Sequence, residues 1–141
     1  MNADRQKMHR LARIEMVRKA ALRAAEARLS TANAQARAAD ARRELVHELI
    51  AASSTASGYA APALLRGAAD LRQLLLNALT DATLRATEKN RDRDRAAQAF
   101  AMAQGRQERT TSDLATVTAR AEADAEERER ADQAPGRKRK Q

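Results

Sequence analysis

The first 57 residues contain neither glycine nor proline, and this absence limits the possible folds more than any other feature of the chain. Alanine, arginine, leucine and glutamate are frequent in this segment, and all four have high helix propensities. Because the residues that usually end a helix are missing, residues 4 to 52 are predicted to form one long helix. The whole chain of 141 residues has only four glycines and two prolines, so it has few places to turn.

A heptad pattern of mainly apolar residues runs along this first predicted helix. Alternating steps of three and four residues predict a seam that faces another helix. The seam positions are Met8, Leu11, Glu15, Arg18, Leu22, Ala25, Leu29, Ala32, Ala36, Ala39, Arg43, Val46 and Ile50. Alanine recurs among them, so two helices can approach closely, although each alanine buries little apolar area.

Residues 53–61 have the composition of a connection between two helices. Serine, threonine and the first glycine are concentrated there, and they favour turns over helix interiors. Pro62 suits the first turn of a second helix, where its missing N–H group costs nothing. This helix is predicted over residues 62 to 134, followed by a disordered basic tail at 135–141.

Two helices joined by a short loop run antiparallel. The predicted fold is therefore all-α, a long antiparallel two-helix coiled-coil hairpin that forms a single domain over residues 1–134. Apolar side chains are densest just after the turn, between Leu64 and Leu79, so the hairpin is expected to be most stable there. Gly105 and the cluster Thr110-Thr111-Ser112 leave open whether the second helix is continuous or kinks and restarts.

The residue types that carry chemistry are scarce. The chain has one Tyr, one Phe, no Trp and no Cys. His9 and His47 are far apart on one predicted helix, with no third ligand at metal-binding spacing. The glycines are isolated, so there is no glycine-rich loop for phosphates. These features predict a non-enzymatic protein with no catalytic residue, no cofactor and no metal.

The charge balance favours anionic partners. Lysine and arginine number 27 against 19 acidic residues, which gives a net charge of +8. Nucleic acid, an acidic protein surface and anionic lipid all fit this balance. The near absence of aromatic residues for base stacking weighs against nucleic acid. No run approaches the roughly 20 apolar residues of a membrane-spanning helix, and no secretory signal follows the basic start.

Two segments resemble the FliJ family of flagellar type III export and its YscO-like counterparts in the injectisome. Residues 62–79, PALLRGAADLRQLLLNAL, are similar to the family's segment at the start of the second helix. Residues 125–132, AEERERAD, are similar to its ending of acidic residues and arginines. The order of a long helix, a loop, a longer helix and a basic tail also matches the family. The alternative interpretation, a basic coiled-coil protein that binds nucleic acid or an acidic protein, remains open.

The resemblance implies a cytoplasmic, non-enzymatic stalk at the inner-membrane export apparatus. Such a stalk sits in the central hole of the export ATPase hexamer, promotes its assembly and activity, and links it to the FlhA-type export gate. Export chaperones are further partners. The free ends enter the ring, and here they carry Arg10, Arg13, Glu126, Arg128 and Arg130. Residues near the turn contact the gate, and the corresponding positions are Leu45, Leu49, Leu71, Leu75, Ala78 and Ala82.

Overall fold

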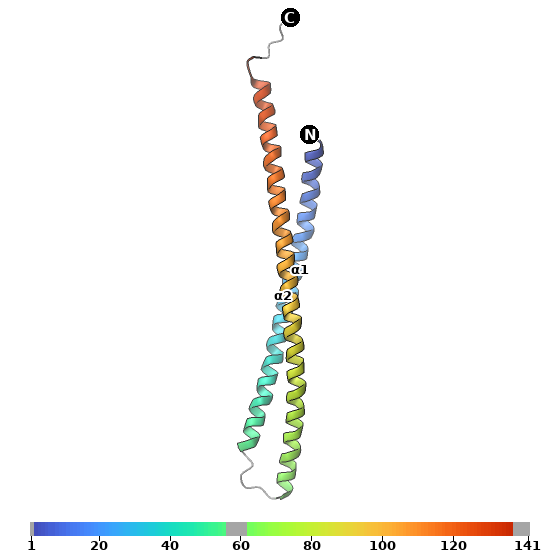
Figure 1. Ribbon diagram of the computed structural model, residues 1–141, viewed down its shortest axis with the longest axis vertical. Coiled ribbons are helices and arrows are strands. Elements are labelled where there is room, and N and C mark those ends of the chain that lie inside the picture. The colour runs from blue at the N-terminus through green and yellow to red at the C-terminus, as the bar shows by residue number, and fades with distance from the viewer. Residues whose placement is uncertain (1, 56–61, 137–141) are drawn as a thin grey trace. The chain divides into compact units, whose positions relative to one another are not determined.

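The structure, a computed structural model, describes residues 2–55 and 62–136 and has the predicted all-α fold. Helix α1 comprises Asn2–Thr55 and helix α2 comprises Pro62–Gln133. The described ranges contain no β-strand. The two helices run antiparallel as a hairpin (Figure 1). Most of the predicted loop and most of the basic tail lie outside the described residues, whereas residues 53–55 continue α1.

The contacts along the hairpin form two units, and each unit contains a segment of both helices. Unit 1 combines Met1–Ala24 with Ala101–Gln141, and unit 2 is Ala25–Phe100. The break between the units therefore crosses α1 and α2 in their interiors, not at a loop.

The seam of unit 2 is built mainly from alanine. Its buried side chains are Ala25, Ala32, Ala36, Ala39 and Val46 of α1 and Ala82 and Ala86 of α2. All five α1 positions belong to the predicted heptad seam. Ala36 is only 2% exposed and Ala86 only 1%. Small side chains on both helices allow the helices to approach closely and to cover these residues. The free energy gained by burying them is the sum of many weak contacts.

The seam of unit 1 follows the predicted spacing but is less apolar. Met8, Leu11, Glu15, Arg18 and Leu22 of α1 are all half-buried, while most of their neighbours are exposed. On α2, Val117 is buried, and the threonine at position 110 is the one buried polar residue among the described residues. The centre of this seam is therefore polar.

Helix α2 is continuous through the glycine and the threonine cluster that could have interrupted it. Gly105 does not have a positive φ angle. The hydroxyls of Thr110 and Thr111 donate hydrogen bonds to the carbonyl oxygens of Arg106 and Gln107, four residues earlier, at 3.0 Å in both cases. Threonine makes this bond inside a helix. The cluster is therefore an interior part of α2 and does not cap a new helix.

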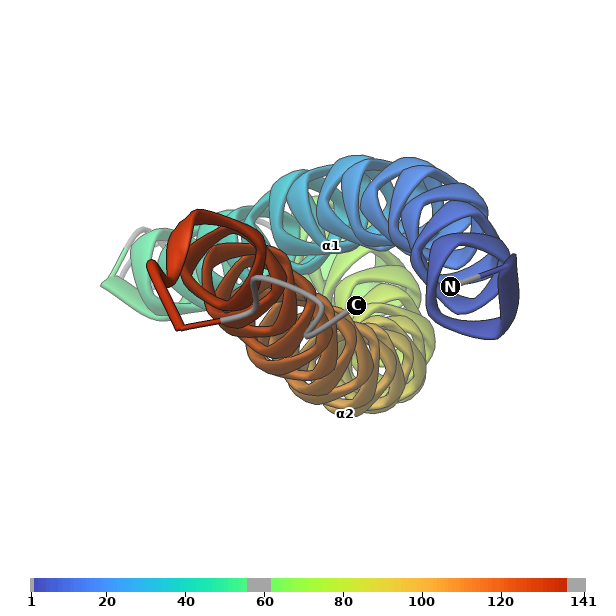
Figure 2. The same ribbon diagram turned by 90° about the horizontal axis from the view of Figure 1, so that it is seen from above.

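The helices of unit 2 separate toward the loop. Figures 1 and 2 both show the end of α1 and the start of α2 apart. Every residue of α2 from 62 to 74 is exposed, including Leu64 and Leu71. The hairpin was expected to be most stable next to the turn, but the burial that would support this stability is not found there in the described residues. Leucines are abundant there, but α1 does not cover them, and burial is concentrated further along the seam.

Candidate partner-binding surfaces

Neither a metal cluster nor a membrane span is found in the described ranges. No group of three or more His, Cys, Asp or Glu side chains in residues 2–55 and 62–136 is placed to hold a metal ion. Among the same residues, no helix combines the length and the apolar character needed to cross a bilayer.

Five leucines near the turn, two on α1 and three on α2, are candidates for contact with a partner. We call Leu45, Leu49, Leu64, Leu71 and Leu75 the turn-side leucines. On α2, steps of seven and four residues place the last three on one helix face. A further step of seven residues leads to Ala82, which is buried in the seam. The three leucines therefore lie on the seam face of α2, in the part of it that α1 does not fully cover. Four of the five leucines are classed as exposed, and Leu75 is half-buried.

The six residues expected at the export gate differ in accessibility. Leu45, Leu49 and Leu71 are 55%, 47% and 52% exposed, so a partner can reach them. Leu75 and Ala78 are half-buried. Ala82 is only 4% exposed, because it packs in the seam. The hairpin itself therefore covers the last of these positions, and the accessible apolar surface lies closer to the turn.

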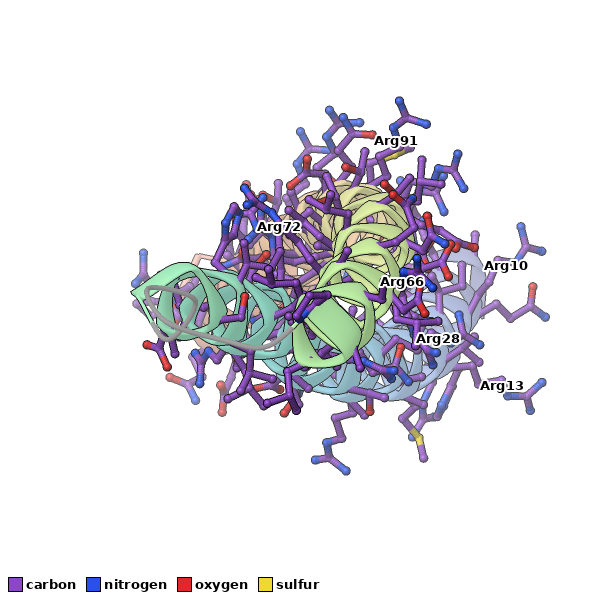
Figure 3. The ribbon with its side chains drawn as sticks, turned by 90° about the horizontal axis from the view of Figure 1, so that it is seen from below. Arg10, Arg13, Arg28, Arg66, Arg72 and Arg91 are labelled. Carbon is purple, nitrogen blue, oxygen red and sulfur yellow. The ribbon has the colours of Figure 1, made fainter. Side chains whose placement is uncertain are left out.

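The five residues expected at the ATPase ring are all exposed in unit 1. Arg10 and Arg13 line a shallow depression along α1 together with Ile14. Both arginines extend away from the ribbon in Figure 3. On α2, Arg130 pairs with Glu126, with 3.4 Å between Nη2 and Oε2, one helical turn apart. Such exposed pairs contribute little to stability.

Arg128 lies on a different part of the unit 1 surface. It lines a depression between the two helices that also includes Asp4, Arg5, Met8, Ala121 and Asp124. The lining therefore carries two carboxylates as well as two guanidinium groups. Opposite charges are interspersed at this end, and the surface has no single sign.

A polar contact between the helices of unit 1 was missed by the sequence reasoning. The Arg18 guanidinium donates hydrogen bonds to the Arg106 carbonyl oxygen, at 2.9 Å, and to the Thr110 hydroxyl. The Thr111 hydroxyl approaches Glu15 Oε1 at 3.2 Å. The signal in the sequence was the presence of Glu15 and Arg18 in the seam. Their partners could not be assigned because the register of α2 was unknown.

Unit 2 has a smaller polar contact of the same kind. Asn90 Nδ2 donates hydrogen bonds to Asp40 Oδ1, at 3.1 Å, and to the Ala86 carbonyl oxygen, at 2.8 Å. Arg43, the polar seam position of this unit, is half-buried, and its Nε atom is buried with no hydrogen-bond partner among the described residues. The hydrogen bond between Asn90 and Asp40 therefore links the two helices of unit 2, whereas the buried Arg43 Nε atom does not.

Comparisons of the chain with protein-family models, with curated proteins and with solved structures gave no match.

Proposed function

We propose that this protein is a non-enzymatic stalk of a type III protein export apparatus, similar to the FliJ family. In this proposal the hairpin sits in the central hole of the export ATPase hexamer at the cytoplasmic face of the inner membrane. It promotes assembly and activity of the hexamer and couples it to an FlhA-type gate. The observation that carries the proposal is the uncovered leucine face at the turn end of an antiparallel helix pair.

The turn-side leucines are suited to contact with another protein. Leu64 is 66% exposed and Leu71 is 52% exposed, although both continue the face that is buried elsewhere in unit 2. A contiguous apolar face in water is unfavourable, and such faces are typical of protein interaction sites. Binding of the gate over these leucines would remove apolar area from water. Each Å² removed would stabilise the complex by about 25 cal/mol.

The free-end surface of unit 1 is suited to a different kind of contact. Arg10, Arg13, Glu126, Arg128 and Arg130 are exposed, and they carry both signs of charge. Charged pairs at a solvated surface are individually weak. Arg130 and Glu126 already pair with each other, whereas Arg10, Arg13 and Arg128 form no ion pair in the described residues and could pair with acidic groups on the wall of a ring.

The test is to separate the gate contact from the ATPase contact. Leu71→Asp places a charge among the turn-side leucines, whereas Leu84→Asp is a matched control. Leu84 is also an exposed leucine of α2, at 65%, but it lies two residues from the buried Ala82 and so on the opposite helix face. We expect Leu71→Asp to weaken gate binding by about tenfold or more. We expect Leu84→Asp to leave gate binding unchanged.

Both variants should stimulate ATP hydrolysis by the export ATPase as well as the parent protein does. Circular dichroism of each variant reports whether the helices are intact. The gate assignment is wrong if both variants bind the gate equally well. The stalk assignment as a whole is wrong if the folded parent protein neither binds nor stimulates the ATPase.

A second candidate function is a basic coiled-coil protein that binds nucleic acid or an acidic protein. The exposed arginines of both helices favour it, among them Arg28, Arg66 and Arg91, which are labelled in Figure 3. Binding to DNA through such residues should be strong and should fall steeply with salt, because phosphate contacts release counterions. Weak binding at physiological salt would favour the stalk.

A further inference from the structure

A shallow groove in unit 2 brings three cationic side chains together from two helices. The groove has a volume of about 260 Å³, and its lining contains no carboxylate. The lining residues are Gln35, Ala38, Ala39 and Arg42 of α1 and Arg85 and Lys89 of α2. Both walls belong to the same unit, so the groove is formed by packing within unit 2.

The helical spacing explains why these side chains converge. Gln35, Ala38 and Arg42 are three and four residues apart, and Arg85 and Lys89 are four apart, so each set lies on one face of its helix. The hydrogen bond from Asn90 to Asp40 holds the two helices together at this level. The alanines leave room between the longer side chains.

The three cations keep their donor groups available. Arg42, Arg85 and Lys89 have no ion pair within 4.0 Å in the part of the chain that the structure describes. Three carboxylates belong to the surroundings of the groove. Asp40 accepts the hydrogen bond from Asn90, and Asp81 and Glu88 line the adjoining depression on α2 with Arg85 and Lys89. An arginine has five N–H donors and a lysine has three, so the groove presents many donors to an anion.

We propose that this groove binds an oligophosphate group, meaning two or three linked phosphates that are either free or carried by a nucleotide. The planar guanidinium fork matches phosphate oxygens in pairs, and the ammonium group adds a point charge. The groove of about 260 Å³ is near the lower end of the size of small-molecule pockets, about 300–1,000 Å³, and this size suits a small anion. No aromatic side chain is in the lining to stack on a base. This inference does not depend on the export-stalk function.

The experiment titrates the full-length protein with sodium tripolyphosphate and, separately, with ATP, without divalent metal and at low salt. Isothermal titration calorimetry measures the dissociation constant, and amide chemical shifts locate the site. We expect saturable binding with a dissociation constant of about 1 mM or tighter. Equal affinities identify the free oligophosphate as the ligand, whereas tighter ATP binding identifies a nucleotide. Either result supports the site.

A matched pair of double variants tests the residues. Arg42→Gln with Arg85→Gln removes two charges from the groove. Arg28→Gln with Arg91→Gln removes two charges from exposed arginines that are not part of the lining of this groove. Glutamine maintains helix propensity in both cases. We expect the groove variant to weaken binding by about tenfold or more, because charge-assisted hydrogen bonds are lost. The control should weaken it by less than about threefold.

Glu88→Gln should strengthen binding, whereas the groove variant weakens it. Removing this carboxylate from beside Arg85 and Lys89 should tighten tripolyphosphate binding by about two- to threefold, because the repulsion of the anion is reduced. Equal weakening by the two double variants would show that only the net charge matters. That result, or the absence of saturable binding by the folded parent protein, overturns the site.

Discussion

The Arg18 guanidinium reaches across the seam of unit 1 and donates a hydrogen bond to the Thr110 hydroxyl. It also donates to the Arg106 carbonyl oxygen at 2.9 Å, and this same oxygen accepts the Thr110 hydroxyl at 3.0 Å. Thr110 is only 2% exposed. Alanine pairs resemble one another and tolerate a shift in register, whereas a buried polar pair fits only one register. We infer that this contact fixes the register of unit 1.

Thr110→Val removes the hydroxyl while maintaining the side-chain volume. We expect a loss of about 1 kcal/mol in the free energy of unfolding, because the part-buried guanidinium loses one acceptor. Urea unfolding followed by circular dichroism measures the change. Thr116→Val is the matched control, since Thr116 makes the same bond to a carbonyl four residues earlier, at 3.0 Å, but is exposed. The control should change stability by less than about 0.5 kcal/mol.

The double variant Arg18→Leu with Thr110→Val should be more stable than the sum of the two single effects predicts. Replacing both polar partners with apolar groups leaves no unsatisfied donor in the seam. A coupling energy of about 0.5 kcal/mol or more is expected for groups in direct contact. Additive effects in the same urea experiment would show that the two side chains do not interact in solution.

Gly105→Ala should stabilise the protein. Gly105 is inside the continuous helix α2, and a Cβ atom built there meets no heavy atom within 4 Å. Alanine is favoured over glycine in a helix interior by about 1 kcal/mol, because glycine loses more backbone entropy. The melting temperature should rise in a thermal scan. A fall would indicate that α2 bends at this position.

Ala36→Leu should destabilise unit 2. Ala36 is 2% exposed at the seam, so the larger side chain must displace α2 or adopt a strained rotamer. Overpacking of this kind costs about 1–3 kcal/mol. Ala41→Leu adds the same side chain at an exposed position of α1 and should be nearly neutral. Equal urea midpoints for the two variants would contradict the close approach of the helices.

Within unit 2, the backbone amides of α2 should exchange hydrogen faster near the turn than further along the helix. Residues 66–74 are all exposed, whereas the stretch from 82 to 96 includes buried Ala82 and Ala86. Helices without tertiary packing are marginal in water, and they open more easily than packed ones. Mass spectrometry should therefore find exchange faster by about tenfold or more in residues 66–74. Uniform protection along α2 would mean that the turn-side leucines are covered in solution.

The sequence predicted the seam of α1 because the periodicity of a helix is local. Positions such as Ala25, Ala32 and Val46 are buried, and polar members such as Glu15 and Arg18 are half-buried, as the spacing predicts. The accessible part of the candidate gate surface was harder to predict. Leu71 and Ala82 have the same helical phase, but only Ala82 is covered, because coverage depends on where α1 separates from α2.

The chain by itself determined its two long helices and the faces they bury. The absence of glycine and proline from the first 57 residues and the heptad spacing act between near neighbours, so they can be recognised without a fold. Tertiary structure decided the pairing of Arg18 with Thr110 and the groove that joins Arg42 to Arg85 and Lys89. These features depend on the register between two helices, and an alanine-lined seam of similar small side chains does not specify that register from either helix alone.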